Sequence, residues 1–408
     1  MYIERLVLNE FRAIAHSDVE FTHPTSPRAR GLELRNINVL VGTNGGGKST
    51  VLKGIAAAVL GDVIDLESVT GGAVTSWPRI GATGSCQARV TYRSHADTDV
   101  AGGPEEASGT LSEAWALIDD RGATHGRRPD LENESDHRDV NLFGYGPQRV
   151  AGENVDTADA LDATARVANL FEQTQTLIPP ESWLPELDDE ELDAVNRLMP
   201  PEVQLTGGVL DGLIEVENRG LRVSRAMLSD GAQSYMAWML DLVFRLRRSG
   251  GGDFRSVRGT VLVDEVDQRM HPAWQQLVLA QLADGLPNLQ FICSAHSPLL
   301  AGGLRPENLT VLEPDHDAPG DGAMKASHFE EDVYGRTSDG VLTSSYFNLA
   351  SSRSEQFRQE LRRLVDQART MDQAAIDFIE ALSGGSVQGD VRVRSEIVTR
   401  PDRLRRRR

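Results

Sequence analysis

A glycine-rich segment near the N-terminus carries the clearest chemistry in the sequence. Positions 42–49 read Gly-Thr-Asn-Gly-Gly-Gly-Lys-Ser, which matches the phosphate-loop pattern G-x-x-x-x-G-K-[ST] in full. Glycines let backbone N–H groups turn inward around phosphates, and the start of a following helix adds partial positive charge. In such a loop Lys48 is expected to reach the outer phosphates, and Ser49 to ligate Mg²⁺.

The surroundings of this segment favour phosphate binding over the alternative, a glycine-rich turn that binds nothing. An apolar strand pattern at 38–41 precedes it, and a helical pattern at 49–60 follows it. A phosphate loop needs both neighbours, because the strand and the helix hold its two ends. The residues expected to bind the nucleotide are Gly42, Thr43, Asn44, Gly45, Gly46, Gly47, Lys48, Ser49 and Thr50.

A second element with chemistry is an apolar strand that ends in two acids. Residues 261–265 read Val-Leu-Val-Asp-Glu. By itself such a strand end is explained equally well by solvated carboxylates, but a phosphate loop upstream changes the interpretation. Asp264 is then expected to hold Mg²⁺ through water, and Glu265 to polarise the attacking water as a general base. Two acids are needed because one carboxylate cannot both serve the metal and face the water.

The segment 228–233 opens a predicted helix shortly before that strand. Ser229 followed by Asp230 is a good helix N-cap, which is a sufficient explanation in itself. The segment also resembles the Leu-Ser-x-Gly signature of the ABC-type ATPases, which lies on a helix before the acidic strand. The resemblance implies that Ser229 and Gly231 contact the γ-phosphate of an ATP held by the opposite subunit. It therefore implies a homodimer whose heads enclose two ATP molecules, since the chain contains one copy of each motif.

Four further positions take on roles through this resemblance. His296, in Ser-Ala-His-Ser-Pro, is similar to the switch histidine that senses the γ-phosphate and steadies the attacking water. Asp267 matches the loop that couples the two sites across the dimer. Gln148, in Gly-Tyr-Gly-Pro-Gln-Arg, resembles a glutamine near Mg²⁺ and water, with an ordinary turn as the alternative. Arg12 resembles an arginine near the nucleotide in the DNA-repair branch. The catalytic residues expected are Glu265, His296 and Lys48, and the metal ligands expected are Ser49, Asp264 and Gln148.

The spacing of the motifs resembles the SMC/RecF-like branch of these ATPases. Lys48 and Asp264 are 216 residues apart (264 − 48), farther than in transporter cassettes. The stretches at 9–12 and 264–272 also resemble this branch. Within it the chain is most similar to compact bacterial AAA-type ATPases of the OLD and PtuA kind, many of which occur in phage-defence operons, and the stretches at 145–149 and 180–184 add to that likeness. The resemblance implies an α/β fold: a P-loop NTPase with an ABC-type ATPase head and a helical insertion. The head would combine a mostly parallel core sheet with an antiparallel β lobe.

Periodicity predicts the elements that position these residues. Strands are expected at 2–7, 38–41, 87–92, 114–118, 213–216, 260–264 and 290–293, and helices at 49–60, 163–173, 190–198, 231–247 and 272–283. The last ~60 residues are expected to be helical, with an apolar stripe of Phe357, Leu361, Leu364 and Ala368.

The chain is predicted to divide into four parts. They are the phosphate-loop half of the head with the β lobe (1–160), an inserted lobe (161–226), the signature, acidic strand and switch histidine (227–335), and a helical segment with the basic tail Arg405–Arg408 (336–408).

Composition narrows the class of protein. A hydrophobic fraction of 39% and a charged fraction of 25% argue against wholesale disorder. The net charge of −19 argues against non-specific coating of DNA, although it leaves room for a local basic groove. No apolar run approaches the ~20 residues that span a bilayer. The two cysteines fit a reducing compartment, so a soluble cytoplasmic protein without membrane contact is expected.

These features together predict an ATP-dependent switch. The chain is expected to bind ATP and Mg²⁺, dimerise, hydrolyse ATP, and pass the change to an effector protein. The effector would be a nuclease or toxin in phage defence, with DNA or a phage product as the trigger. The alternative is a RecF/SMC-like DNA-binding ATPase in DNA repair, and a transport ATPase is disfavoured by the motif spacing.

Overall fold

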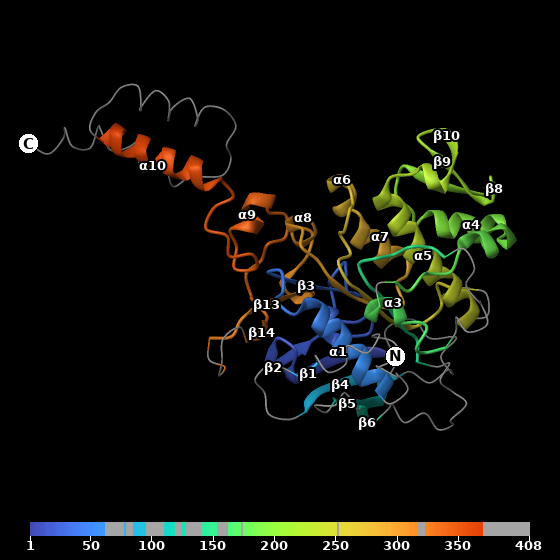
Figure 1. Cartoon of the computed structure of the whole chain (residues 1–408), viewed down its shortest axis with the longest axis horizontal. Coiled ribbons are helices and arrows are strands. Elements are labelled where there is room, and N and C mark those ends of the chain that lie inside the picture. Colours follow the sequence, from blue (N-terminus) through green and yellow to red (C-terminus); the bar gives the residue numbers. More distant parts are fainter. Residues whose placement is uncertain are drawn as a thin grey trace, which may run out of the picture. The chain divides into compact units, whose positions relative to one another are not determined.

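The computed structural model groups the chain into two compact units, Met1–Tyr334 and Gly335–Arg408 (Figure 1). The structure describes residues 1–61, 77–78, 85–94, 110–118, 124–127, 140–152, 162–172, 174–250, 253–316, 318 and 323–369. The phosphate loop, the acidic strand end and the signature segment all fall within the first unit.

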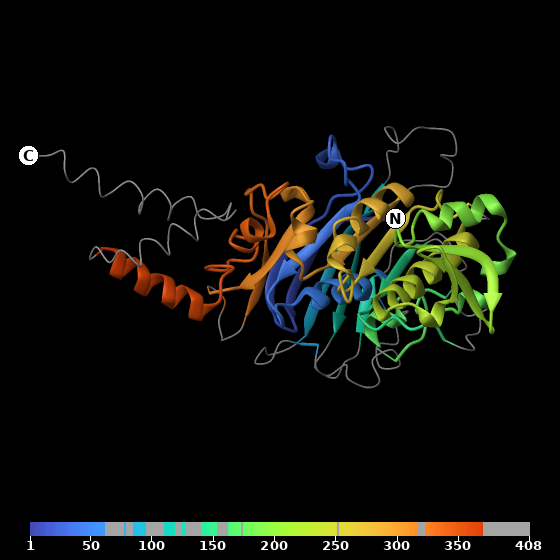
Figure 2. The same cartoon turned by 90° about the horizontal axis from the view of Figure 1, so that it is seen from above.

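The first unit is built on one mixed sheet. Among the described residues its strand order is β6-β5-β4-β1-β2-β14-β13-β3-β12-β11-β7. The neighbours from β13 to β7 are parallel, whereas those from β6 to β2 are antiparallel. Figure 2 shows the strands crossing the centre of the unit with helices beside them. The predicted α/β fold, with a mostly parallel core sheet and an antiparallel lobe, is confirmed. The strands are β1 (Tyr2–Phe11), β2 (Ile14–Glu20), β3 (Ile37–Gly42), β4 (Cys86–Ser94), β5 (Thr110–Ile118), β6 (Thr124–Arg127), β7 (Leu142–Tyr145), β11 (Gly259–Val263), β12 (Leu289–Ser294), β13 (Leu309–Pro314) and β14 (Met324–Ser327).

Burial explains the character of these strands. Every residue of β11 and β12 is buried, as expected for parallel strands that are covered on both faces. In β4 buried and less buried residues alternate, which is typical of an antiparallel strand with one face on the core. Helix α1 (Lys48–Leu60) contacts β3 and β12 of the parallel part and β1, β4 and β5 of the antiparallel part. The helix that follows the phosphate loop is therefore anchored in the core.

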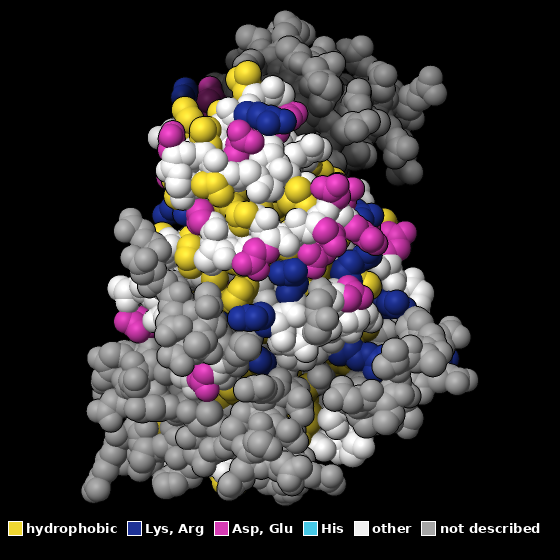
Figure 3. Space-filling view, turned by 90° about the vertical axis from the view of Figure 1, so that its right-hand side faces the viewer, with side chains coloured by type: hydrophobic (Ala, Val, Ile, Leu, Met, Phe, Trp, Pro, Cys, Tyr) yellow, Lys and Arg dark blue, Asp and Glu magenta, His cyan; other side chains and the backbone are white. Residues whose placement is uncertain are grey.

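A second, three-stranded antiparallel sheet lies between β7 and the signature helix in the sequence. It consists of β8 (Val203–Leu210), β9 (Leu213–Asn218) and β10 (Leu221–Ser224), and helix α4 (Asp189–Asn196) precedes it. Figure 3 shows the side of the molecule on which these elements lie, with acidic and basic side chains interspersed and hydrophobic side chains among them. The described residues visible on this side do not form a broad basic surface. The large exposed hydrophobic residues of this sheet and the turn after it are Val209, Leu210, Leu221 and Met227.

Two predicted helices differ from the structure. The helix expected at 163–173 is confined to α3 (Ala168–Phe171), because the residues before it bond to the strand β7. The Arg166 carbonyl accepts a hydrogen bond from the Gly144 N–H at 2.9 Å, which an uninterrupted helix would not allow. The single helix expected at 272–283 is split into α6 (Pro272–Gln275) and α7 (Val278–Gly285). The signature helix, α5 (Asp230–Ser249), forms as predicted.

The second unit contains two helices among its described residues, α9 (Ser338–Leu342) and α10 (Glu355–Arg369). Two residues of the predicted apolar stripe, Phe357 and Leu361, lie in α10 and are half-buried. The side chains at 364 and 368, and all residues after 369, lie outside the described part. In the portion of the chain that the structure describes, no helix has the length and apolar character needed to cross a membrane.

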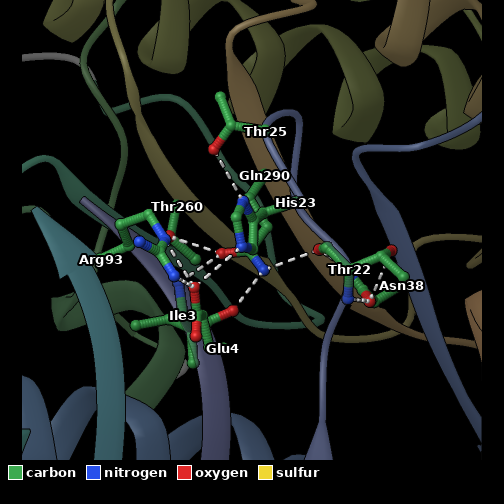
Figure 4. Close-up of polar contacts among 9 residues, drawn as sticks. All are labelled: Ile3, Glu4, Thr22, His23, Thr25, Asn38, Arg93, Thr260 and Gln290. Carbon is green, nitrogen blue, oxygen red and sulfur yellow. Dashed lines mark hydrogen bonds and ion pairs between the residues drawn. The ribbon is translucent and has the colours of Figure 1, made fainter. Parts of the chain in front are cut away.

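A buried polar cluster joins the first strand to the parallel core (Figure 4). The amide of Gln290 on β12 accepts hydrogen bonds from the Ile3 N–H and the Thr260 hydroxyl, and donates to the carbonyls of Ile3 and Thr22. These four bonds are 2.7 to 3.0 Å long, and Gln290 is fully buried. Removing the amide would leave several buried backbone groups without partners, so the cluster fixes β1 against the core.

His23 lies at the edge of this cluster and is 2% exposed. Its Nε2 is 3.3 Å from the Glu4 carboxylate, which also pairs with Arg93, and its ring stacks on Tyr2. Burial lowers the pKa of His23 below its usual value, Glu4 opposes this shift, and Arg93 adds to it. Folded His23 therefore resists protonation more than His23 in the unfolded chain.

We expect the free energy of unfolding to fall as the pH drops below the unfolded pKa of histidine, ~6.5, because the unfolded chain then takes up a proton that folded His23 resists. A His23→Phe variant keeps a ring on Tyr2 but cannot titrate. On acidification its free energy of unfolding should decrease less steeply than that of wild type. The two slopes should differ by at most ~1.4 kcal/mol per pH unit. Urea unfolding at a series of pH values measures the slope. The exposed His16, changed to Gln, serves as control, and equal slopes for wild type and His23→Phe would contradict the assignment.

Candidate functional site: a phosphate-loop edge

Four parallel strands end at one edge of the sheet and bring four loops side by side. The register aligns Val39 of β3 with Cys293 of β12, Cys293 with Val263 of β11, and Val263 with Tyr145 of β7. The loops that follow these strands therefore meet at their carboxyl ends, which is where open α/β sheets bind ligands. The predicted site residues that these loops carry are Lys48, Ser49, Asp264, Glu265, His296 and Gln148.

The phosphate loop folds around its own lysine. The Lys48 ammonium donates hydrogen bonds to the carbonyls of Gly42 and Thr43, both at 2.9 Å, and the residue is buried. Gly47, just before it, has a φ of 94°, a left-handed conformation that glycine adopts without strain. Burial lowers the pKa of Lys48, while the acidic residues that follow β11 favour its charged form. The loop is thus preformed with a cation inside it.

The other predicted residues of this loop differ in exposure. Ser49, at the second position of α1, is half-buried and lies at the helix N-terminus, where anions are attracted. The tip of the loop is open, since no atom lies within 4 Å of the position that a β-carbon of Gly45 would occupy. The exposed members are Thr43, Asn44 and Gly45, the half-buried ones are Gly42, Gly47 and Ser49, and the buried ones are Gly46, Lys48 and Thr50.

The two acids after β11 are held by the end of β12. The Ser294 hydroxyl donates to the Asp264 carboxylate at 2.5 Å and accepts from the Glu265 N–H at 2.7 Å. Asp264 is buried, and Glu265 is half-buried with a φ of 50°. A left-handed backbone is uncommon for a residue other than glycine and costs about 1–2 kcal/mol. This strain persists only because the surrounding hydrogen bonds hold the turn.

Asp267 is turned into the subunit. Its Oδ2 accepts hydrogen bonds from the backbone N–H groups of His296, at 2.9 Å, and Ser297, at 2.7 Å, and the residue is 7% exposed. Its Oδ1 is buried without a hydrogen-bond partner among the described residues. The resemblance implies a role between subunits, but the carboxylate orders the loop of His296 within its own chain. His296 itself is exposed at the site edge.

The signature segment is a capped helix N-terminus, as the simpler interpretation predicts. The Ser229 hydroxyl accepts a hydrogen bond from the Ala232 N–H at 3.4 Å, and Ser229 is exposed. Gly231 packs closely against the loop after β11. A β-carbon at position 231 would lie 2.1 Å from the Arg269 carbonyl oxygen, so only glycine fits there. The structure thus gives Gly231 a packing role that the sequence motif did not reveal.

The segment after β7 places one predicted residue at the surface and one unpredicted residue in the interior. Gln148 is exposed, and its carbonyl accepts a hydrogen bond from the Asn169 amide at 2.9 Å. Arg149, directly after it, is buried beneath the two acids of β11. Sequence reasoning did not single out Arg149 or Ser294. The only available signal was their position next to predicted motifs, because neither residue type reveals which way its side chain points.

Arg12 lies at the turn between β1 and β2 and is half-buried, with a φ of 55°. Its guanidinium lies 5.8 Å from the centre of the Trp77 ring, and burial lowers its pKa. Ile14, two residues later, lies 3.3 Å from the position that a β-carbon of Gly47 would occupy. The β1–β2 turn therefore packs against the phosphate loop, but a contact of Arg12 with nucleotide remains a prediction.

The fold and this edge are those of a P-loop protein. The parallel core sheet, the phosphate loop after β3 and the acids after β11 are the features that assign it. Comparison with protein families agrees. Residues 115–302 match a family described as "AAA domain, putative AbiEii toxin, Type IV TA system", and residues 5–137 match one described as "AAA domain".

Individual relatives include a Septu protein and a retron ATPase. A Septu protein PtuA of Bacillus mycoides (strain KBAB4) is 25% identical over 363 residues, which make up 85% of this chain and 45% of that protein. A "Retron Ec83 probable ATPase" of Escherichia coli is 30% identical over 125 residues, 30% of this chain and 23% of that protein. The chain thus spans less than half the length of these curated relatives.

A solved structure of an SMC head, bound to the C-winged helix domain of ScpA, shares the fold. It is 14% identical to this chain, with a TM-score of 0.50, and the match covers 81% of this chain and 98% of that one. At this level of identity the likeness concerns the fold alone.

Replacing Gly231 with alanine should destabilise the isolated chain, because the new methyl group collides with the Arg269 carbonyl. We expect Gly231→Ala to lower the free energy of unfolding by about 2 kcal/mol or more, measured by urea unfolding without nucleotide. Gly303→Ala is the matched control, since the nearest atom to its methyl would be 3.6 Å away. If both variants unfold at the same urea concentration as wild type, the packing role of Gly231 is wrong.

Proposed function

We propose that this chain binds ATP with Mg²⁺ and hydrolyses it to ADP and phosphate, as a homodimeric switch that controls an effector protein. The observation that supports this most directly is the meeting of Lys48, Asp264 and Glu265 at one edge of the sheet. The relatives named as ATPases and the matching AAA families support it further.

The residues at the edge have the chemistry that MgATP requires. The buried Lys48 and the N–H groups of the loop suit the phosphates, and the oxygens of Ser49 and Asp264 suit Mg²⁺, a hard cation that prefers oxygen ligands. Glu265 is suited to take a proton from the attacking water. The water oxygen bonds to the γ-phosphorus as the bond from that phosphorus to the bridging oxygen breaks, and ADP leaves.

The loop of His296 and the segment of Gln148 complete the proposed catalytic edge. His296 is proposed to sense the γ-phosphate, and its backbone is already held by Asp267. Gln148 is proposed to lie near Mg²⁺ and the attacking water, and Arg12 near the nucleotide. Because His296 and Gln148 are exposed, both can approach a ligand bound at the edge without rearrangement of the core.

A second subunit is proposed to complete each site. Ser229 is exposed at the N-terminus of the 20-residue helix α5, and the N-terminus of a helix attracts anions. The hydroxyl of Ser229 caps its own helix and makes no described contact with the phosphate loop of its chain. A head-to-tail homodimer would bring this terminus to the γ-phosphate on the partner's loop.

The proposed setting is phage defence, in the cytoplasm. It is supported by the names of the relatives, a Septu protein and retron ATPases. The proposed effector is a nuclease or toxin that responds to the ATP state of the dimer, with DNA or a phage product as the trigger.

The alternative is a RecF/SMC-like DNA-binding ATPase in DNA repair, with which the fold shared with an SMC head is compatible. The gene neighbourhood distinguishes the two. An adjacent nuclease or toxin gene would favour defence, and a cluster of replication or repair genes would favour the repair function.

Changing Glu265 to Gln should stop turnover while leaving ATP binding intact, because the amide has the same size but cannot accept the proton. We expect kcat to fall by ~10²-fold or more, with ATP affinity changed less than ~3-fold. Steady-state phosphate release measures kcat, and titration with a fluorescent ATP analogue measures the affinity. Glu215→Gln, at a half-buried position on β9, is the control and should match wild type. If Glu265→Gln hydrolyses ATP at the wild-type rate, Glu265 is not the general base.

Mixing two inactive variants should restore activity if each site is shared between subunits. Ser229→Arg disrupts the signature, and Lys48→Ala disrupts the phosphate loop. A mixed dimer retains one site in which the phosphate loop of one subunit and the signature of the other are both unmutated. An equal mixture should show roughly a quarter of wild-type turnover, since half the dimers are mixed and each has one working site. Each variant alone is the control, because both sites of its homodimer are disrupted. Absence of rescue at every mixing ratio would show that the site is complete within one chain.

A further inference from the structure

Arg149 is a buried cation whose charge is directed at backbone carbonyls. It is 4% exposed, and its Nε donates to the Gly146 carbonyl at 2.8 Å. Its Nη2 donates to the carbonyl of Asp264 and, at 3.0 Å, to that of Glu265. It forms no ion pair within the described part of the chain. A buried guanidinium without a carboxylate partner is costly, so its contacts with these two carbonyls need a reason.

The carbonyls that Arg149 contacts belong to the strained turn at the end of β11. Glu265 is left-handed there, and its N–H is fixed by the Ser294 hydroxyl at 2.7 Å. Its carbonyl is fixed by Arg149 and by the Gln268 N–H, at 3.1 Å. The N–H and the carbonyl of Glu265 are thus both hydrogen-bonded to side chains outside the turn. Because the backbone sets the direction in which a side chain leaves it, these bonds determine where the Glu265 carboxylate can lie.

The signature helix covers the other face of the guanidinium. The Cζ of Arg149 lies 5.6 Å from the centre of the Trp238 ring, and Trp238 is fully buried on α5. Trp238 also packs on Tyr145, the last residue of β7, at 5.5 Å. Arg149 therefore contacts the helix that Ser229 caps on one side and the turn of Glu265 on the other.

We propose that Arg149 is a positioning residue for Glu265: it holds the turn in the conformation needed for turnover and links that turn to the signature helix. The inference rests on the proposed ATP hydrolysis. It assigns to the residue after Gln148 a task that neither the motif nor the family matches attach to it.

The chemistry of the side chain suits this task. Burial lowers the pKa of Arg149 to about 10, and the carboxylates of Asp264, Glu265 and Asp267 oppose that shift, so the guanidinium stays charged at neutral pH. Its planar fork reaches three carbonyls at once, whereas a lysine ammonium is a point charge on a flexible stem. Lysine at this position would keep the charge but lose the geometry.

The test compares Arg149→Lys with Arg166→Lys in the full-length chain. Arg166 is a matched buried arginine: it is 2% exposed, donates to the Val140 carbonyl at 3.2 Å, and lies 5.6 Å from the Phe143 ring, yet it has no contact with the turn of Glu265 in the described structure. We expect Arg149→Lys to lower kcat by ~30-fold or more with KM for ATP changed less than ~3-fold. Arg166→Lys should lower the unfolding temperature comparably but change kcat less than ~3-fold.

A double-mutant cycle then asks whether Arg149 acts through Glu265. If it does, Arg149→Lys should slow single-turnover hydrolysis strongly in wild type but less than ~3-fold in the Glu265→Gln background. Full additivity of the two losses would overturn the inference, as would equal kcat for the two arginine variants. If wild type hydrolyses no ATP, the proposed function fails and the inference with it; if wild type hydrolyses ATP and only the Arg149 comparison fails, the proposed function stands.

A folding failure is handled by a second pair of variants. Should Arg149→Lys not fold, Arg149→Gln and Arg166→Gln make the same comparison, because glutamine keeps an NH2 donor group without burying an ammonium. If every Arg149 variant fails to fold while the Arg166 variants fold, the residue serves the fold and not turnover, and the inference is wrong.

Discussion

The chain leaves β11 through a turn in which Glu265 takes a left-handed backbone conformation, and two other segments hold the polar groups of that turn. Ser294, at the end of β12, binds the Asp264 carboxylate and the Glu265 N–H. Arg149, after β7, binds the two carbonyls. The cost of the left-handed residue, about 1–2 kcal/mol, is offset only while all these partners are present. The turn therefore depends on the positions of both neighbouring strands.

The same turn organises the loops beyond it. Asp267 holds the backbone of His296 and Ser297, and the loop that contains Arg269 presses on Gly231 at the start of α5. A shift at the N-terminus of α5 would thus be transmitted to the loop after β11 through this close contact. The proposed switch needs a connection of this kind, because packed interiors transmit displacement and do not absorb it.

Charge at the site is arranged before any ligand arrives. Lys48 is already drawn into its loop by the carbonyls of Gly42 and Thr43, and Arg149 is already buried under the acids. Part of the desolvation cost of the proposed phosphate site is therefore met during folding. A preorganised polar site of this kind stabilises developing charge without reorganising at the moment of reaction.

The sequence by itself determined the parts of this protein that depend on neighbouring residues. The phosphate loop between β3 and α1, the acids after β11 and the capped start of α5 were all predicted, because glycine spacing, apolar periodicity and capping residues act over a few positions. The small sheet of β8 to β10 was predicted only in its middle strand, and α3 is shorter than its periodicity suggests, because Arg166 bonds to β7. Only the tertiary structure decided that Asp267 turns inward, that Gly231 meets Arg269, and that Arg149 lies beneath the Asp264 carbonyl 115 positions away in the chain. The type of a side chain and its local pattern do not specify its direction, which is set by whichever distant segment offers a partner once the sheet has assembled.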